Sequence, residues 1–161
     1  MVRLAAPSTG GRAGLVALGL LVGALSAIPA RAQQPAQPSP FLFNSDAGVI
    51  LNFVKADKTA DFESVLNKLK EGLAKSEKPE RKAMAAGWKV FKASESNNGM
   101  AIYVFIIDPV AKGQEYSVGN LLVEAFGGEE GNKLYKTYSD SYGNPAIGAL
   151  LHLSSFLDLG K

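Results

Sequence analysis

The sequence contains no cysteine and a single histidine, His152. The absence of cysteine excludes disulfide bonds, thiolate metal sites, cysteine nucleophiles and the lipidated cysteine that anchors bacterial lipoproteins. A single histidine excludes a multi-histidine metal site within one chain. No aspartate-rich loop has the spacing of a calcium site, so we expect neither a resident metal ion nor another cofactor.

The chain also has no strong excess of charge of either sign, since 17 basic and 15 acidic residues give a net charge of +2. Three of the basic residues, Arg3, Arg12 and Arg31, lie within the first 32 positions. Subtracting these three from 17 leaves 14 basic against 15 acidic residues, a net charge of −1. Nucleic acid is therefore not an expected partner.

Residues 1–32 have the three parts of a secretory signal peptide: two arginines, an apolar run over 14–28, and the small residues Ala30 and Ala32. An uncleaved membrane anchor is the alternative. The run of 15 residues is shorter than the ~20 that cross a bilayer, and Pro29 interrupts a helix. We predict export to the periplasm or the medium, cleavage after Ala32, and no membrane attachment afterwards.

Residues 33–45 are predicted to be a linker. Positions 33–40 hold three prolines and three glutamines, a composition with nothing to bury. The composition turns apolar between Phe41 and Asp46, and we place the folded domain at 46–161. A length of roughly 100–150 residues suits one domain with its own core.

The first half of this domain predicts a strand, a helix and a hairpin. Over 47–55 apolar side chains fall on both sides of an extended chain, with Val49, Leu51 and Phe53 opposite Ile50, Asn52 and Val54. Over 59–75 the apolar period becomes helical, and 78–86 can add a helical turn. Two extended runs, 87–94 and 100–108, flank Asn97-Asn98-Gly99, which is typical of a hairpin.

The second half predicts a broken helix and a last strand. Ser117 caps a helix that Gly127-Gly128 ends, a further helix follows over 129–142, and a strand over 147–159 comes after a turn at 143–145. The complete order is that of a ferredoxin-like α+β sandwich, with a four-stranded antiparallel sheet and helices on one face. Its two central strands correspond to 47–55 and 100–108, both apolar on two sides. We therefore expect a homodimer packed through the bare sheet face.

In these elements the chain resembles the dimeric α/β barrel superfamily, which includes antibiotic-biosynthesis monooxygenase-like and stress-responsive barrel domains. The resemblance covers roughly 47–158 and depends on VILNFVK, the 62–73 helix, GWKVFK and AIYVFIID, in that order. It implies a barrel of two paired sheets with pockets between sheet and helices. Members include cofactor-independent oxygenases, haem-degrading enzymes and proteins without an assigned reaction.

Three residues are candidates for catalysis. His152 has the only side chain whose usual pKa lies near neutrality, so it can serve as an acid, a base or a haem ligand. Asn52 interrupts an apolar strand face and needs polar partners. Trp88 completes the trio of residue types that haem-degrading members use. Only Asn52 lies on the element where haem-degrading members carry the corresponding residue, the first strand. Trp88 and His152 fall on other elements than the tryptophan and the histidine of those members. Each residue also has a purely structural alternative.

The tyrosines form a second group of candidates, among which Tyr103 and Tyr138 could contact a ligand. They could equally pack with their hydroxyls at the edge of the core. Two hypotheses remain open at this point. One is a non-catalytic, homodimeric module that binds a small apolar ligand. The other is an oxygenase-type enzyme acting on an aromatic or haem-like substrate, so the sequence leaves enzymatic activity undecided.

Overall fold

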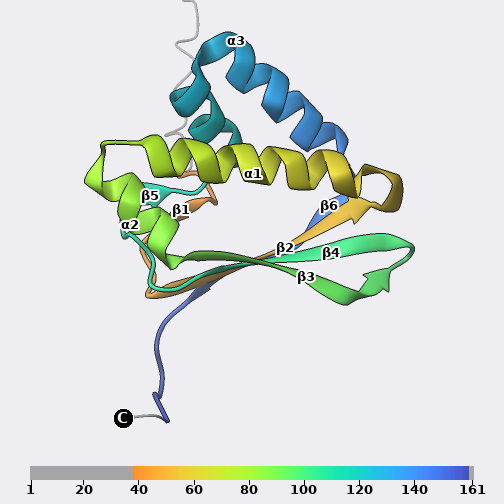
Figure 1. The fold of residues 1–161 in the computed structure, drawn as a ribbon. Helices are drawn as coiled ribbons and strands as arrows, with labels where there is room; N and C mark the ends of the chain where they lie inside the picture. The colour runs from red at the N-terminus through yellow and green to blue at the C-terminus, as the bar shows by residue number, and fades with distance from the viewer. Residues whose placement is uncertain (1–37, 160–161) are drawn as a thin grey trace, which may run out of the picture. The chain divides into compact units, whose positions relative to one another are not determined.

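A computed structural model of the chain describes residues 38–159. The predicted signal peptide, 1–32, and the start of the predicted linker lie outside the described residues. Four strands form one antiparallel sheet in the order β3-β4-β2-β6 (Figure 1). They are β2 (Ala47–Lys55), β3 (Trp88–Asn97), β4 (Met100–Ile107) and β6 (Tyr142–Leu153). This order, with β2 and β4 at the centre, is that of a ferredoxin-like fold, as predicted.

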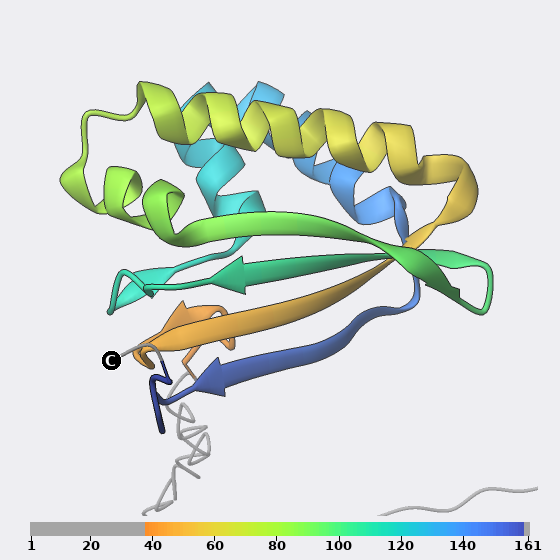
Figure 2. The ribbon, with the colours of Figure 1, turned by 60° about the horizontal axis from the view of Figure 1, so that its bottom comes forward.

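The helices α1 (Thr59–Lys75), α2 (Pro79–Gly87) and α3 (Val118–Asp140) cover one face of the sheet (Figure 2). A short 3-10 turn, Ala56–Lys58, precedes α1. The predicted helix over 59–75 is confirmed, and its buried stripe consists of Phe62, Val65, Leu69 and Leu73. Within 38–159, no helix combines the length and the apolar character that a membrane span requires.

Helix α3 is bent at Gly127, which has φ 81° and ψ 172° and so interrupts the helical conformation. This confirms the predicted break between two helical segments. Ser117 occupies the predicted N-cap position, but its side chain makes no capping hydrogen bond. The bend sets the direction of the second half of α3, which returns across the sheet.

The hairpin is confirmed, because β3 and β4 are joined by Asn98 (φ 51°) and Gly99 (φ 75°). The prediction for the last strand was wrong at both ends. β6 begins at Tyr142 and passes through the expected turn at 143–145 as an irregular edge strand, where proline is tolerated. It stops at Leu153, because Leu153 already pairs with the first residue of β2.

The fold begins before the predicted boundary at residue 46. A short strand, β1 (Leu42–Phe43), pairs with β5 (Gln114–Glu115). Phe43 is fully buried, and its ring lies directly over Gly48, where any Cβ would collide with it. The apolar composition from Phe41 onward thus marks the start of the fold better than the charged Asp46 does.

The two faces of the sheet differ in whether helices pack against them. On the helix-facing side, alternate residues of β2 and β4 are buried, among them Ile50, Val54, Phe105 and Ile107. None of the helices described within residues 38–159 lies over the opposite side (Figures 1 and 2). We call this side the outer face; strand register places on it Val49, Leu51, Phe53, Phe91, Ile102, Val104, Ile106 and Leu151.

Candidate functional site

A cavity of about 260 Å³ lies between the helix-facing side of the sheet and α3. Its walls come from β2, β4, β6, the segment before β1 and both halves of α3. Most of the lining is apolar or aromatic, including Phe41, Ile50, Phe105, Val118 and Ile147. The residues with polar side chains in its lining are Asn52, Ser117, Ser139 and four tyrosines, Tyr116, Tyr135, Tyr138 and Tyr142.

The irregular start of β6 makes room for this cavity. Asn52 pairs with Ile147 while Val54 pairs with Tyr142, so four residues of β6 lie opposite Phe53 alone. Pro145, which has no amide hydrogen to donate to the sheet, lies within this stretch. The chain bows away from β2 there, and Ala146 and Ile147 become part of the cavity wall.

Three side chains in the cavity wall form a hydrogen-bonded chain from α3 to the central strand β2. The Tyr142 hydroxyl lies 2.7 Å from Oδ1 of Asn52 and 2.5 Å from the hydroxyl of Tyr138. Since Tyr142 has one hydroxyl hydrogen and Oδ1 can only accept, Tyr142 donates to Asn52 and Tyr138 donates to Tyr142. The three groups therefore form an ordered relay from Tyr138 to Asn52.

The amide of Asn52 completes this relay inside the sheet. Asn52 is 1% exposed, and its Nδ2 donates to the carbonyl oxygens of Ile50 and Tyr103, each at 3.2 Å. Every hydrogen that the side chains of Asn52, Tyr138 and Tyr142 can donate is thus used within the protein. What remains free toward the cavity is acceptor capacity, chiefly on the oxygen of Tyr138.

Burial holds both tyrosine hydroxyls in their neutral form. It is the main cause that raises the pKa of Tyr138 well above the ordinary tyrosine value, and the neighbouring Tyr142 adds to the effect. Burial also raises the pKa of Tyr142 above that value. The phenols are therefore hydrogen-bonding groups at neutral pH, not bases.

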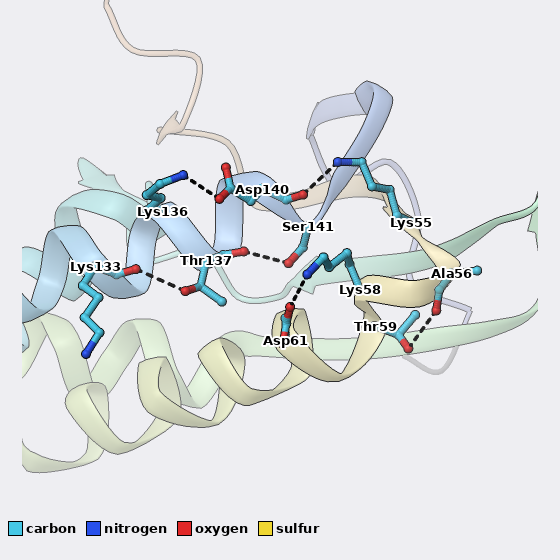
Figure 3. A network of polar contacts seen from close by, with 10 residues as sticks. All are labelled: Lys55, Ala56, Lys58, Thr59, Asp61, Lys133, Lys136, Thr137, Asp140 and Ser141. Carbon is cyan, nitrogen blue, oxygen red and sulfur yellow. Dashed lines mark hydrogen bonds and ion pairs between the residues drawn. The ribbon is translucent and has the colours of Figure 1, made fainter.

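Polar contacts fix the end of α3 that carries Tyr138 and leads into Tyr142 (Figure 3). Lys55 at the end of β2 donates from Nζ to the carbonyl oxygen of Asp140 at 2.9 Å. The buried Ser141 donates from Oγ to the carbonyl oxygen of Thr137 at 2.7 Å, and its own carbonyl accepts from the amide of Lys55. These bonds hold the two phenols in register with Asn52.

Of the sequence candidates, Asn52 and Tyr138 lie at the cavity, and Trp88 and His152 do not. Trp88 lines a separate groove between α1, α2 and β3, which is larger and more open, at about 520 Å³. Its Nε1 is buried and makes no hydrogen bond within 38–159. His152 pairs with Gly48, four residues from Asn52 along β2, and its exposed ring packs on Phe43 with centroids 4.3 Å apart.

Tyr103 contributes its backbone to the site, while its hydroxyl points elsewhere. The hydroxyl donates to the carboxylate of Glu63 at 2.5 Å, and Lys92 donates to the same oxygen at 2.8 Å. Both bonds lower the pKa of Glu63, and the bond from Lys92 has the larger effect. The Tyr103 hydroxyl is thus committed to a surface ion pair.

Fold and cavity together define a small α+β sandwich of ferredoxin-like topology with an aromatic cavity between its sheet and its longest helix. Comparison of the chain with protein-family models, with curated proteins and with solved structures finds no match in any of the three. The described residues hold no group of three or more histidines, cysteines, aspartates or glutamates suited to a metal ion. Function must therefore be inferred from the geometry of this site.

Proposed function

We propose that this protein is an exported, non-catalytic module that binds one small aromatic molecule in the cavity between α3 and the sheet. The observation that supports this most strongly is the relay of Tyr138, Tyr142 and Asn52 in a cavity whose lining is mostly apolar or aromatic. Sites for small ligands combine apolar walls with a few converging polar groups. A volume of about 260 Å³ suits a molecule of one or two rings.

The relay also defines the polar group that the ligand carries. Because all hydrogens of the relay are donated internally, the relay offers the ligand acceptor oxygens, of which that of Tyr138 is the first. A hydroxyl or N–H on the ligand can donate to it without breaking any existing bond. At Tyr138, a ligand group that only accepts would compete for the hydrogen that Tyr142 already receives.

The oxygenase-type alternative has less support in this geometry. The described lining of the cavity includes no carboxylate, amine or imidazole, so it offers no group that exchanges a proton near neutral pH. Haem degradation by the trio named above needs Asn52, Trp88 and His152 at one place. These three lie at separate positions in the fold.

We also propose that the protein is a homodimer in which two outer faces pack together. The half-buried Val49, Leu51 and Phe53 of β2 pair with Ile106, Val104 and Ile102 of β4, which gives a continuous apolar surface at the centre of the sheet. Removing such a surface from water contributes roughly 25 cal/mol per Å². A second copy would cover it with an identical, self-complementary face.

Calorimetric titration with 2-naphthol and 2-methoxynaphthalene tests the binding proposal. The two probes share a ring system, but only 2-naphthol can donate a hydrogen bond. We expect 2-naphthol to bind about tenfold more tightly, the effect of one net hydrogen bond. Tyr138→Phe should bring the affinity for 2-naphthol down to that for the methyl ether. Equal affinities of the unaltered protein for both probes would contradict the proposed role of the relay.

Export has a separate test. The intact mass of the protein recovered from the periplasm or medium of cells that express the full sequence should correspond to a chain that begins at Gln33. A mass that retains residues 1–32, or recovery in the cytoplasm alone, would contradict the proposed localisation.

A further inference from the structure

The segment that follows β6 carries large apolar side chains in water. Within residues 154–159, Phe156 is 98% exposed, Leu157 68% and Leu159 91%. Single exposed apolar residues are common on protein surfaces, but three within four positions form a patch. Such a patch is typical of a surface that becomes buried in an assembly.

The start of this segment is held in place. The carboxylate of Asp46 accepts a hydrogen bond from the amide of Ser155 at 3.1 Å through one oxygen, and one from Lys112 at 2.8 Å through the other. The amide of Asp46 also donates to the carbonyl oxygen of Leu153 at 3.0 Å. The segment therefore leaves the sheet in a defined direction.

That direction points away from the helices. In Figure 1 the dark blue chain after β6 runs from the sheet to the side opposite α1, α2 and α3, toward the C-terminus. Figure 2, in which the lower side is turned forward, shows the same segment at the end of β6, away from the helices. The segment thus extends beyond the outer face, into the space that a copy packed against that face would occupy.

The size of the outer face makes an additional contact useful to such a dimer. Four strands spaced about 4.8 Å apart, each about 26 Å long, have a flat footprint of about 500 Å², and their side chains expose a larger accessible area than this. A stable interface buries about 800 Å² of each partner. A buried aromatic side chain contributes about 150–250 Å², so burial of Phe156 alone enlarges such an interface considerably, and Leu157 and Leu159 add to it.

We infer that residues 154–159 form an arm that packs on the second copy and clamps the homodimer. This inference depends on the proposed homodimer and adds a specific contact to it. Each protomer packs Phe156, Leu157 and Leu159 against its partner, and the partner packs the same three residues against the first protomer. Because the arms are exchanged symmetrically, the dimer gains two such contacts.

Sedimentation equilibrium of protein purified from cells that express the full sequence tests the arm. The unaltered chain is compared with a chain that stops after Leu153 and with the double substitution Phe156→Ser, Leu157→Ser. We expect both changes to raise the dimer dissociation constant at least about tenfold, as the loss of interface anchors does. Lys133→Ser on the exposed surface of α3 is the control and should leave the constant unchanged.

A second measurement uses the absence of cysteine from the sequence. Phe156→Cys introduces a unique thiol, whose reaction with a maleimide should slow as protein concentration rises through the dissociation constant. Lys133→Cys should react at a constant rate. The arm is contradicted, and the homodimer is not, if two results are found together. The dimer keeps its affinity without residues 154–159, and the thiol at position 156 reacts equally fast at all protein concentrations. An unaltered chain that stays monomeric overturns both, and shows that another segment or partner covers these surfaces.

Discussion

The hydroxyl of Tyr142 lies 2.7 Å from Oδ1 of Asn52, and this contact joins the edge strand β6 to the centre of the sheet. Asn52 is buried in β2 with its amide hydrogens bound to backbone carbonyls. Without Tyr142, its Oδ1 would have no donor among the described side chains. The same pair thus satisfies a buried amide and forms the polar end of the cavity.

Replacement of Tyr142 by phenylalanine should therefore cost stability as well as binding. Tyr142→Phe leaves the buried Oδ1 of Asn52 without its donor, a loss that typically lowers the free energy of unfolding by about 1–3 kcal/mol. Urea unfolding followed by circular dichroism measures it. Tyr135→Phe is the matched control, since the Tyr135 hydroxyl makes no hydrogen bond within 38–159; its effect should stay within about 0.5 kcal/mol. Equal losses in both variants would show that the relay contributes nothing to stability.

Stability should fall on the alkaline side of pH 10. Burial is the main cause that raises the pKa values of Tyr103, Tyr116, Tyr138 and Tyr142. In the unfolded chain these phenols lose their protons near pH 10, while the folded state retains them. The stability they contribute is thus complete below about pH 10 and is lost as the pH rises toward their folded-state values.

Urea midpoints at pH 8, 10 and 11 measure this loss, with absorbance at 295 nm reporting phenolate formation. The decrease between pH 8 and 11 should be smaller in Tyr142→Phe than in the unaltered protein, because one of the shifted groups has been removed. A midpoint that is constant over this range, or an unchanged decrease in the variant, would contradict the assignment of buried neutral phenols.

The bend in α3 predicts opposite effects at two adjacent glycines. Gly127 has a backbone conformation (φ 81°, ψ 172°) that essentially only glycine adopts, so Gly127→Ala should lower the free energy of unfolding by about 1–3 kcal/mol. Gly128 is helical, and beyond its chain neighbours and its own helix backbone a Cβ there would meet no atom of residues 38–159 within 4 Å. Gly128→Ala should raise stability by about 0.5–1 kcal/mol. Thermal melting compares them, and a stabilising Gly127→Ala would contradict the described bend.

Two neighbours on β3 test the dimer. Phe91 is 51% exposed and lies on the outer face opposite Val104, whereas Val90 is 43% exposed and lies on the helix-facing side opposite Phe105. Phe91→Ser should weaken the dimer, seen by light scattering as a shift toward the mass of one protomer. Val90→Ser should leave the mass unchanged. If both substitutions act alike, the outer face is not the interface.

Much of the fold was predictable because its elements have strong periodic signals. The helical period over 59–75 and the turn at Asn98-Gly99 gave correct helix and hairpin bounds within a few residues. β6 was misplaced because Pro145 and its neighbouring Gly143 resemble a turn in sequence. Only the pairing with β2 shows that this stretch is a bulged edge strand.

The site was less predictable, because it depends on pairing between distant segments. An asparagine within an apolar strand does indicate a buried polar contact, and Asn52 was identified on that basis. Its partner was not, since 90 residues separate it from Tyr142 and the register of β6 decides whether they meet. The spacing of Tyr138 and Tyr142 by four residues was the available signal. His152 was a candidate through its ability to exchange a proton, and Trp88 through the resemblance to haem-degrading proteins; packing places both away from the cavity.

A crystal structure of the protein with 2-naphthol tests the central proposal most directly, because three apolar regions compete for the probe. We expect the naphthol oxygen within hydrogen-bond distance, roughly 2.7 Å, of the Tyr138 hydroxyl, and its rings in the cavity between α3 and the sheet. A probe bound instead in the groove beside Trp88, or on the outer face, would contradict the proposed site.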